Sequence, residues 1–154
     1  MPHSHHTLMR ERIASACLDL IRIPSVTGDE TAIADFLEAW AKKAKFPVIR
    51  HSNALIVGAP DAQRPTVALV GHTDTVPAHP SDGDAFQDGD RIVGLGTSDM
   101  KGSLAVMQVL FETLTLDALP FNLMLNDDAP TWNAIACVFE RLDTRSPQPN
   151  APTR

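Results

Sequence analysis

Two short segments contain the residue types that could do chemistry in this chain. The first, Gly71–Pro77, places His72 and Asp74 two residues apart, directly after an apolar run. The second, Gly94–Gly102, places Asp99 after two glycines and before a stretch with helical spacing. A neutral imidazole is a good ligand for Zn²⁺, and a nearby carboxylate can fix its tautomer and raise its basicity. Together the two segments indicate part of a metal site in a hydrolase.

Each segment also has an ordinary structural interpretation. His72 could end a strand, Asp74 could cap a turn, and Asp99 could cap the helix that follows it. The spacing Gly-x-Gly-x-x-Asp superficially resembles a dinucleotide-binding loop. A carboxylate at the place of the third glycine would repel a pyrophosphate, so a cation fits this loop better than an anion. We therefore favour metal binding, because Asp99 has two oxygens and could bridge two metal ions about 3.5–4 Å apart.

Other polar residues are weaker candidates. Lys101 is interpreted either as a solvated residue at a helix start or as a residue that orients the Asp99 loop. Asp127 and Asp128 form a carboxylate pair, but Asn-Asp-Asp-Ala-Pro is typical of a turn. The isolated histidines His51 and His79 are expected to be exposed. His3, His5 and His6 are expected to be solvated terminal residues, with adventitious metal binding as the alternative.

The apolar pattern predicts the elements that position the two segments. Helical spacing predicts three helices, over about residues 7–21, 30–44 and 100–114. Thr27 or Asp29 could cap the second helix. Strands are predicted over about residues 47–50, 54–57, 66–70, 91–93 and 121–125. The order of these elements predicts a layered α/β domain.

The strand predicted at 66–70 matters most for the site. It is apolar without alternation, which is typical of a strand buried on both faces of a parallel or mixed sheet. Ligands of open α/β sheets bind beyond the carboxyl ends of the strands. His72 and Asp74 are expected at that place.

Composition and charge exclude several classes of protein. The chain has 154 residues, of which 44% are hydrophobic and 21% charged, as in an ordinary globular domain. A net charge of -6 without a basic cluster argues against nucleic-acid binding. No apolar run could span a bilayer, so no membrane partner is expected, and the N-terminus lacks a secretory pattern. Cys17 and Cys137 are too few for a disulfide framework, which predicts a cytoplasmic location.

The two segments, in this order and spacing, resemble the motifs of a known family. Gly-His-Thr-Asp-Thr-Val-Pro at 71–77 and Gly-Leu-Gly-Thr-Ser-Asp-Met-Lys-Gly at 94–102 are similar to the co-catalytic zinc aminoacylase and carboxypeptidase family. That family includes succinyl-diaminopimelate desuccinylase and acetylornithine deacetylase. Ile-Pro-Ser-Val-Thr-Gly at 23–28 resembles its N-terminal segment. The similarity covers about residues 8–125, and it implies that residues 1–125 are the N-terminal part of the zinc hydrolase catalytic domain. Residues 90–102 are most similar to the desuccinylase branch.

The resemblance implies a fold, a chemistry and a role for each site residue. The implied fold is a truncated metallo-exopeptidase-like α/β domain, a three-layer mixed sheet flanked by helices. His72 would bind one zinc ion, Asp99 would bridge two, and Asp74 would be the catalytic residue that steers His72. Cobalt could take the place of zinc, and the Asp99–Met100 peptide bond would be cis. The implied reaction is hydrolysis of the amide bond of a small N-acyl amino acid, with a glutamate as general base.

The sequence departs from the family's pattern after residue 125. The expected glutamate pair, which carries the base and the next ligand, is replaced by Asn126-Asp127-Asp128-Ala129-Pro130. Later ligands and the family's dimerisation domain are missing from this sequence. Residues 126–154 are predicted to be a divergent, largely disordered tail, for which a frameshift or premature end is one explanation.

Three hypotheses about function follow. The first is a zinc-dependent deacylase of the desuccinylase type. The second is a non-catalytic fragment with at most weak metal binding. The third is a small interaction module without metal. We favour the hydrolase for ancestry and the non-catalytic fragment for activity, because two ligands without a base would support little turnover.

Overall fold

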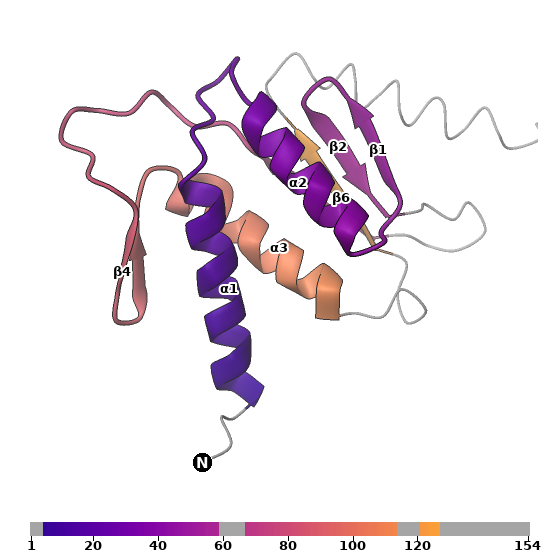
Figure 1. Ribbon diagram of the computed structural model, residues 1–154, viewed down its shortest axis with the longest axis horizontal. Coiled ribbons are helices and arrows are strands. Elements are labelled where there is room, and N and C mark those ends of the chain that lie inside the picture. The colour runs from indigo at the N-terminus through magenta and orange to yellow at the C-terminus, as the bar shows by residue number, and fades with distance from the viewer. Residues whose placement is uncertain (1–4, 59–66, 114–120, 127–154) are drawn as a thin grey trace, which may run out of the picture.

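The computed structural model describes residues 5–58, 67–113 and 121–126 of the chain (Figure 1). Its helical elements are α1 (His5–Ile21), α2 (Thr31–Lys43), the turn η1 (Thr97–Lys101) and α3 (Gly102–Thr113). Its strands are β1 (Val48–His51), β2 (Ala54–Val57), β3 (Val67–His72), β4 (Phe86–Asp88), β5 (Arg91–Val93) and β6 (Phe121–Asn126). Within these ranges, no helix combines the length and apolar character that a membrane span needs.

Four strands form a mixed sheet in the order β1-β2-β6-β3. Strands β1 and β2 pair antiparallel, as do β2 and β6, whereas β3 runs parallel to β6 and places His72 opposite Asn126. Parallel neighbours need a crossover connection, and η1 and α3 lie in the connection from β3 to β6. Strands β4 and β5 form a separate hairpin beside α1 (Figure 1). The mixed sheet with packed helices confirms the predicted α/β class.

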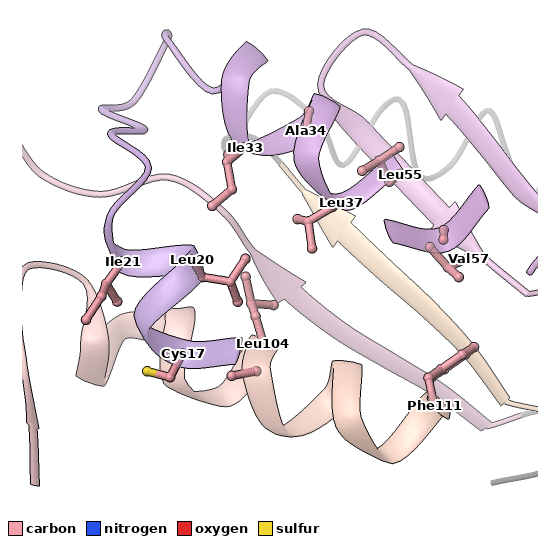
Figure 2. Close-up of a cluster of buried hydrophobic side chains, with 12 residues drawn as sticks. Cys17, Leu20, Ile21, Ile33, Ala34, Leu37, Leu55, Val57, Leu104 and Phe111 are labelled. Atoms are coloured by element: carbon pink, nitrogen blue, oxygen red, sulfur yellow. The ribbon is translucent and has the colours of Figure 1, made fainter. Parts of the chain in front are cut away.

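One apolar cluster joins the helices to the sheet. Figure 2 shows side chains of α1, α2, α3 and β2 that point toward one another. Burial of each large aliphatic side chain contributes about 1.5–3 kcal/mol, so this cluster holds α1 and α3 in place beneath the site. Its buried members are Cys17, Leu20, Ile21, Ile33, Ala34, Leu37, Ala41, Leu55, Val57, Leu104, Ala105 and Phe111.

Strand β3 is less buried than its sequence predicts. The apolar run predicted burial on both faces, but Ala68 is exposed and the Val70 side chain is 48% exposed. In the described part of the chain β3 is an outer strand of the sheet, and α3 is the helix that packs against it. The prediction of a strand is confirmed, and that of burial on both faces is wrong, because an apolar run does not show what covers its second face.

The N-terminus of α2 also differs from the prediction. Neither Thr27 nor Asp29 caps this helix, since Glu30 occupies the cap position and makes no side-chain cap hydrogen bond. The buried Glu30 carboxylate instead accepts hydrogen bonds from Gly28 N–H at 2.5 Å and from Asn53 Nδ2 at 3.3 Å. Thr27 therefore lies outside the helix, and its hydroxyl is available to another partner.

Several predictions lie outside the described residues. They concern the carboxylate pair Asp127 and Asp128, the second cysteine Cys137 and the tail that follows Asn126. These remain predictions.

Candidate metal centre

His72, Asp74 and Asp99 meet at the carboxyl end of β3. Nδ1 of His72 lies 2.9 Å from Oδ1 of Asp74, and Nε2 of His72 lies 2.8 Å from Oδ1 of Asp99. The side chains of His72 and Asp74 are 37% and 20% exposed, whereas that of Asp99 is 86% exposed. The structure thus brings together the three residues that the two motifs singled out. Their roles as ligand and catalytic residues are still predictions.

The two carboxylates control the charge of the imidazole. Partial burial lowers the pKa of His72, but the hydrogen bond with Asp99 and the charges of Asp74 and Asp99 outweigh it and raise the pKa. A neutral imidazole has a single N–H, so it can donate to only one of the two carboxylates. With the proton on Nδ1, the Nε2 lone pair would face a carboxylate oxygen at 2.8 Å. That contact is favourable only with a proton or a cation between the two atoms.

This donor set fits a divalent metal ion in part. Nε2 of His72 and the exposed carboxylate of Asp99 are suitable zinc ligands. Asp74 contacts the other ring nitrogen, Nδ1, and so provides the hydrogen-bond acceptor that orients the ring of a metal-bound histidine. Over residues 5–58, 67–113 and 121–126, no group of three or more His, Cys, Asp or Glu side chains is placed to hold a metal ion. The described residues therefore offer two candidate ligands, which is fewer than a zinc site needs.

The turn η1 gives Asp99 its position. Gly96 begins the turn with φ of 78°, and Lys101 N–H closes it by donating to Gly96 O at 2.8 Å. Asp99 and Met100 have non-helical backbone angles, and the peptide bond between them is cis, as the family resemblance implied. Asp99 lies three residues before the first residue of α3, and its side chain contacts His72. It therefore does not occupy the cap position of α3, and the alternative structural interpretation of this residue is wrong.

Met100 connects the turn to β3. Its Sδ accepts a hydrogen bond from the backbone N–H of His72 at 3.3 Å. A Cβ at Gly71 would come 2.9 Å from Met100 Cε and 2.8 Å from Leu104 Cδ2. The glycine therefore allows both side chains to lie directly against the strand, which brings the turn next to His72.

Lys101 anchors the turn from its buried side. The residue is 1% exposed, and Nζ donates to the carbonyl of Ile23 at 2.7 Å. Burial lowers the pKa of Lys101 to about 8. The interpretation of Lys101 as a solvated residue is wrong, and its geometry fits the alternative that it orients the Asp99 loop.

The segment from Ile23 to Thr27 supports the site from behind. Ser25 is buried, and its hydroxyl donates to Thr73 O at 2.7 Å, while Thr75 N–H donates to Ser25 O at 2.8 Å. Sequence reasoning noted this segment for its family resemblance but missed its contacts with the site. Each of the two segments has hydroxyl side chains two residues apart, at Ser25 and Thr27 and at Thr73 and Thr75. This shared spacing is the signal in the sequence that could have indicated that the two segments lie side by side.

A cleft of about 580 Å³ opens beside the three side chains. The loops after β3, before β4 and before η1 line it, together with Thr27. Its carboxylates come from Asp74, Asp82, Asp84 and Asp99, and its larger apolar side chains from Val76, Phe86, Val93 and Leu95. The volume is in the range of small-molecule sites in proteins.

Comparison with known proteins identifies the origin of this arrangement. The model of a family described as "Peptidase family M20/M25/M40" matches residues 68–141, a range that contains His72, Asp74 and Asp99. This chain belongs to the M20 peptidase family. The match extends past residue 125, after which the sequence departs from the family's motif pattern. The resemblance drawn from the two motifs is thus confirmed.

Individual M20 relatives match over most of this chain but over a minor part of themselves. A "Probable carboxypeptidase" of Emericella nidulans is 30% identical over 148 residues, which cover 88% of this chain and 35% of the relative. A succinyl-diaminopimelate desuccinylase of Ectopseudomonas mendocina is 31% identical over 144 residues, which cover 83% of this chain and 38% of the relative. The chain therefore spans little more than a third of each of these curated M20 relatives.

A solved M20 structure supports the same fold. A Bacillus subtilis protein described as a dinuclear metal binding peptidase from the M20 family superposes with a TM-score of 0.59. The superposition covers 90% of this chain and 41% of that chain at 12% sequence identity. At this identity the comparison shows the fold alone.

Proposed function

We propose that this chain carries part of a metal-dependent amide hydrolase site, in which His72 and Asp99 bind the metal and Asp74 steers His72. The observation that carries the proposal is the contact of 2.8 Å between His72 Nε2 and Asp99, made while Asp74 occupies Nδ1. A divalent metal ion in such a site supplies a Lewis acid that polarises an amide carbonyl. Zinc is the metal we propose, because imidazole nitrogen and carboxylate oxygen suit it, with cobalt as a substitute.

The residues of this chain would hold and orient the reacting groups. Asp74 keeps a proton on Nδ1 of His72, so that Nε2 remains a ligand. Asp99 adds negative charge at the mouth of the cleft, where a cation is held. The cleft of about 580 Å³ is large enough for a small N-acyl amino acid.

The substrate we propose to test first is N-succinyl-diaminopimelate. Residues 90–102 resemble the desuccinylase branch, and one relative at 31% identity carries that name. The carboxypeptidase-named relative favours a second substrate class, short peptides. Both classes contain an amide bond, so the same polarisation chemistry would serve either. A cytoplasmic location remains a prediction from the cysteine count.

A second candidate function is a non-catalytic, weakly metal-binding fragment. No glutamate lines the cleft that the described residues form, and no third ligand is found among them. The absence of a general base would reduce the rate by about 10²–10⁴-fold. We infer that turnover by this chain is far below that of a complete site.

One experiment separates these functions. Zinc binding to the full 154-residue chain is measured by calorimetry, and succinate release from N-succinyl-diaminopimelate is measured with and without zinc. We expect weak saturable binding that is lost in His72→Asn and Asp99→Asn and kept in His51→Asn, an exposed histidine of β1. Zinc-dependent succinate release supports the enzyme, whereas binding without release supports the fragment. Absence of zinc binding by the unaltered chain, or equal binding by His72→Asn, rejects the proposed metal site.

A further inference from the structure

Thr27 reaches the site from the loop between α1 and α2, far from both motifs in the chain. Its hydroxyl donates to Oδ2 of Asp74 at 2.7 Å. The other oxygen of the same carboxylate, Oδ1, lies 2.9 Å from Nδ1 of His72. Thr27, Asp74 and His72 therefore form a continuous chain of hydrogen bonds that ends on the ring whose Nε2 faces Asp99.

The hydroxyl is not needed to hold its own loop. The backbone N–H of Thr27 donates to Thr75 O at 3.1 Å, and Thr75 N–H donates to Ser25 O at 2.8 Å. Val26 also forms an isolated parallel bridge with Thr75. These backbone contacts fix the loop against the segment after β3 whatever side chain stands at position 27.

The single hydroxyl proton of Thr27 has two acceptors within reach. Oδ2 of Asp74 lies at 2.7 Å and the carbonyl oxygen of Thr75 at 3.4 Å. Hydrogen bonds to an ionised acceptor are shorter and about twice as strong as those to a neutral one. The proton is therefore directed to Asp74.

A fixed Asp74 carboxylate favours the His72 tautomer that carries its proton on Nδ1, whereas Asp99 favours the proton on Nε2. Rotation of the Asp74 carboxylate would move Oδ1 out of line with Nδ1, and the hydrogen bond on Oδ2 opposes that rotation. With Oδ1 held as an acceptor, a larger fraction of the neutral rings carries the proton on Nδ1, and a cation bound at Nε2 would complete this preference because Asp99 could then no longer accept a proton from Nε2.

We propose that Thr27 is a positioning residue, whose hydroxyl sets the rotation of the Asp74 carboxylate and through it the tautomer and orientation of His72. The inference rests on the proposed function, in which Nε2 of His72 binds the metal. It adds to the two motifs a residue that neither of them contains.

Three variants of the full chain test this role. Thr27→Val keeps the shape of the side chain and removes the hydroxyl, Thr27→Ser keeps the hydroxyl, and Thr31→Val makes the same change at an exposed position of α2. Two measurements are made on each: zinc affinity by calorimetry, and the His72 tautomer by ¹⁵N–¹H correlation spectroscopy of the metal-free protein with its imidazole neutral.

The expected result separates positioning from a general loss of structure. Thr27→Val should bind zinc about tenfold more weakly, as happens when a partner of a metal-bound histidine is removed, and should show a smaller fraction of Nδ1–H tautomer than the unaltered chain. Its thermal unfolding midpoint should stay near that of the unaltered chain. Thr27→Ser and Thr31→Val should keep both the zinc affinity and the Nδ1–H fraction of the unaltered chain.

Several outcomes would overturn the inference. One is Thr27→Val with unaltered zinc affinity and an unaltered fraction of Nδ1–H tautomer; another is an equal loss of both in Thr31→Val. If the unaltered chain binds no zinc, the proposed metal site fails, and the difference in Nδ1–H fraction between the unaltered metal-free chain and Thr27→Val still tests the role of Thr27.

Discussion

At the scale of single residues, the site depends on how two carboxylates share one imidazole. Their distances from the ring of His72 are nearly equal, at 2.9 Å for Asp74 and 2.8 Å for Asp99. Their surroundings differ, because the side chain of Asp74 is 20% exposed and that of Asp99 is 86% exposed. Hydrogen bonds are stronger where water is partly excluded. Asp74 is therefore suited to hold the ring, and Asp99 is free to bind a cation that enters from solvent.

Replacement of Asp74 by Asn tests this division of roles. The amide keeps the shape of the carboxylate but loses its charge, and it can present N–H₂ toward Nδ1 of His72 instead of an acceptor. We expect zinc affinity to fall by about 10–100-fold in calorimetry. Asp84→Asn is the matched control, since Asp84 lines the same cleft and the change in charge is identical. Equal losses in both variants would show that only the total charge of the cleft matters.

The sequence predicted the residues that meet at the centre but not those that hold them. His72, Asp74 and Asp99 could be selected because an imidazole and carboxylates beside glycines are unusual and resemble a known motif. Thr27 could not, because threonines are common in loops. For Lys101 the sequence left two interpretations open, because a lysine at a helix start is usually solvated. Their partners, Asp74 and the carbonyl of Ile23, are distant in the chain, so only the fold reveals these contacts.

At the scale of elements, the turn η1 determines where Asp99 lies, and its geometry can be tested at two glycines. Gly96 and Gly28 both have positive φ, of 78° and 91°. A Cβ at Gly96 would come 2.6 Å from Cγ2 of Thr75, whereas a Cβ at Gly28 would meet nothing within 4 Å. The two positions therefore share a backbone penalty, and Gly96 alone adds a collision with the buried Thr75.

We expect Gly96→Ala to be clearly more harmful than Gly28→Ala. The left-handed conformation costs an alanine about 1–2 kcal/mol in unfolding free energy at either position. The collision should add about 1–3 kcal/mol at Gly96 and displace the turn, so that zinc affinity falls as well. Denaturant unfolding and calorimetry measure the two effects. Equal destabilisation by both variants would show that η1 tolerates a Cβ and is not tightly held against Thr75.

Element types followed from the sequence more readily than their surroundings. The predicted strand at 54–57 coincides with β2, and the predicted helix at 7–21 differs from α1 by two residues at its start. Apolar spacing determines such elements locally. The predictions that β3 is buried on both faces and that Thr27 or Asp29 caps α2 were wrong. Each depends on a partner from another part of the fold rather than on spacing.

At the scale of the whole molecule, the described chain has one well-packed core and an apolar surface outside it. The cluster of Figure 2 fills the space between α1, α2, α3 and β2. Beyond it, Val106 and Leu110 of α3 are 47% and 37% exposed, and Val70 of β3 is 48% exposed. Exposed apolar patches and outer strands favour association between molecules. The chain spans little more than a third of the curated relatives described above, and we predict that by itself it is marginally soluble.

The apolar stripe on α3 offers a direct test of that prediction. Val106 and Leu110 are four residues apart, so the double change Val106→Glu and Leu110→Lys creates an (i, i+4) ion pair at constant net charge, which stabilises a helix by about 0.2–0.5 kcal/mol. We expect light scattering to show less association, while the free energy of unfolding changes by less than about 1 kcal/mol. Leu104→Ala on the buried face of the same helix should instead cost about 2–5 kcal/mol. Unchanged association in the double variant would mean that the α3 stripe does not cause it, and that the outer strand β3 is the surface to alter next.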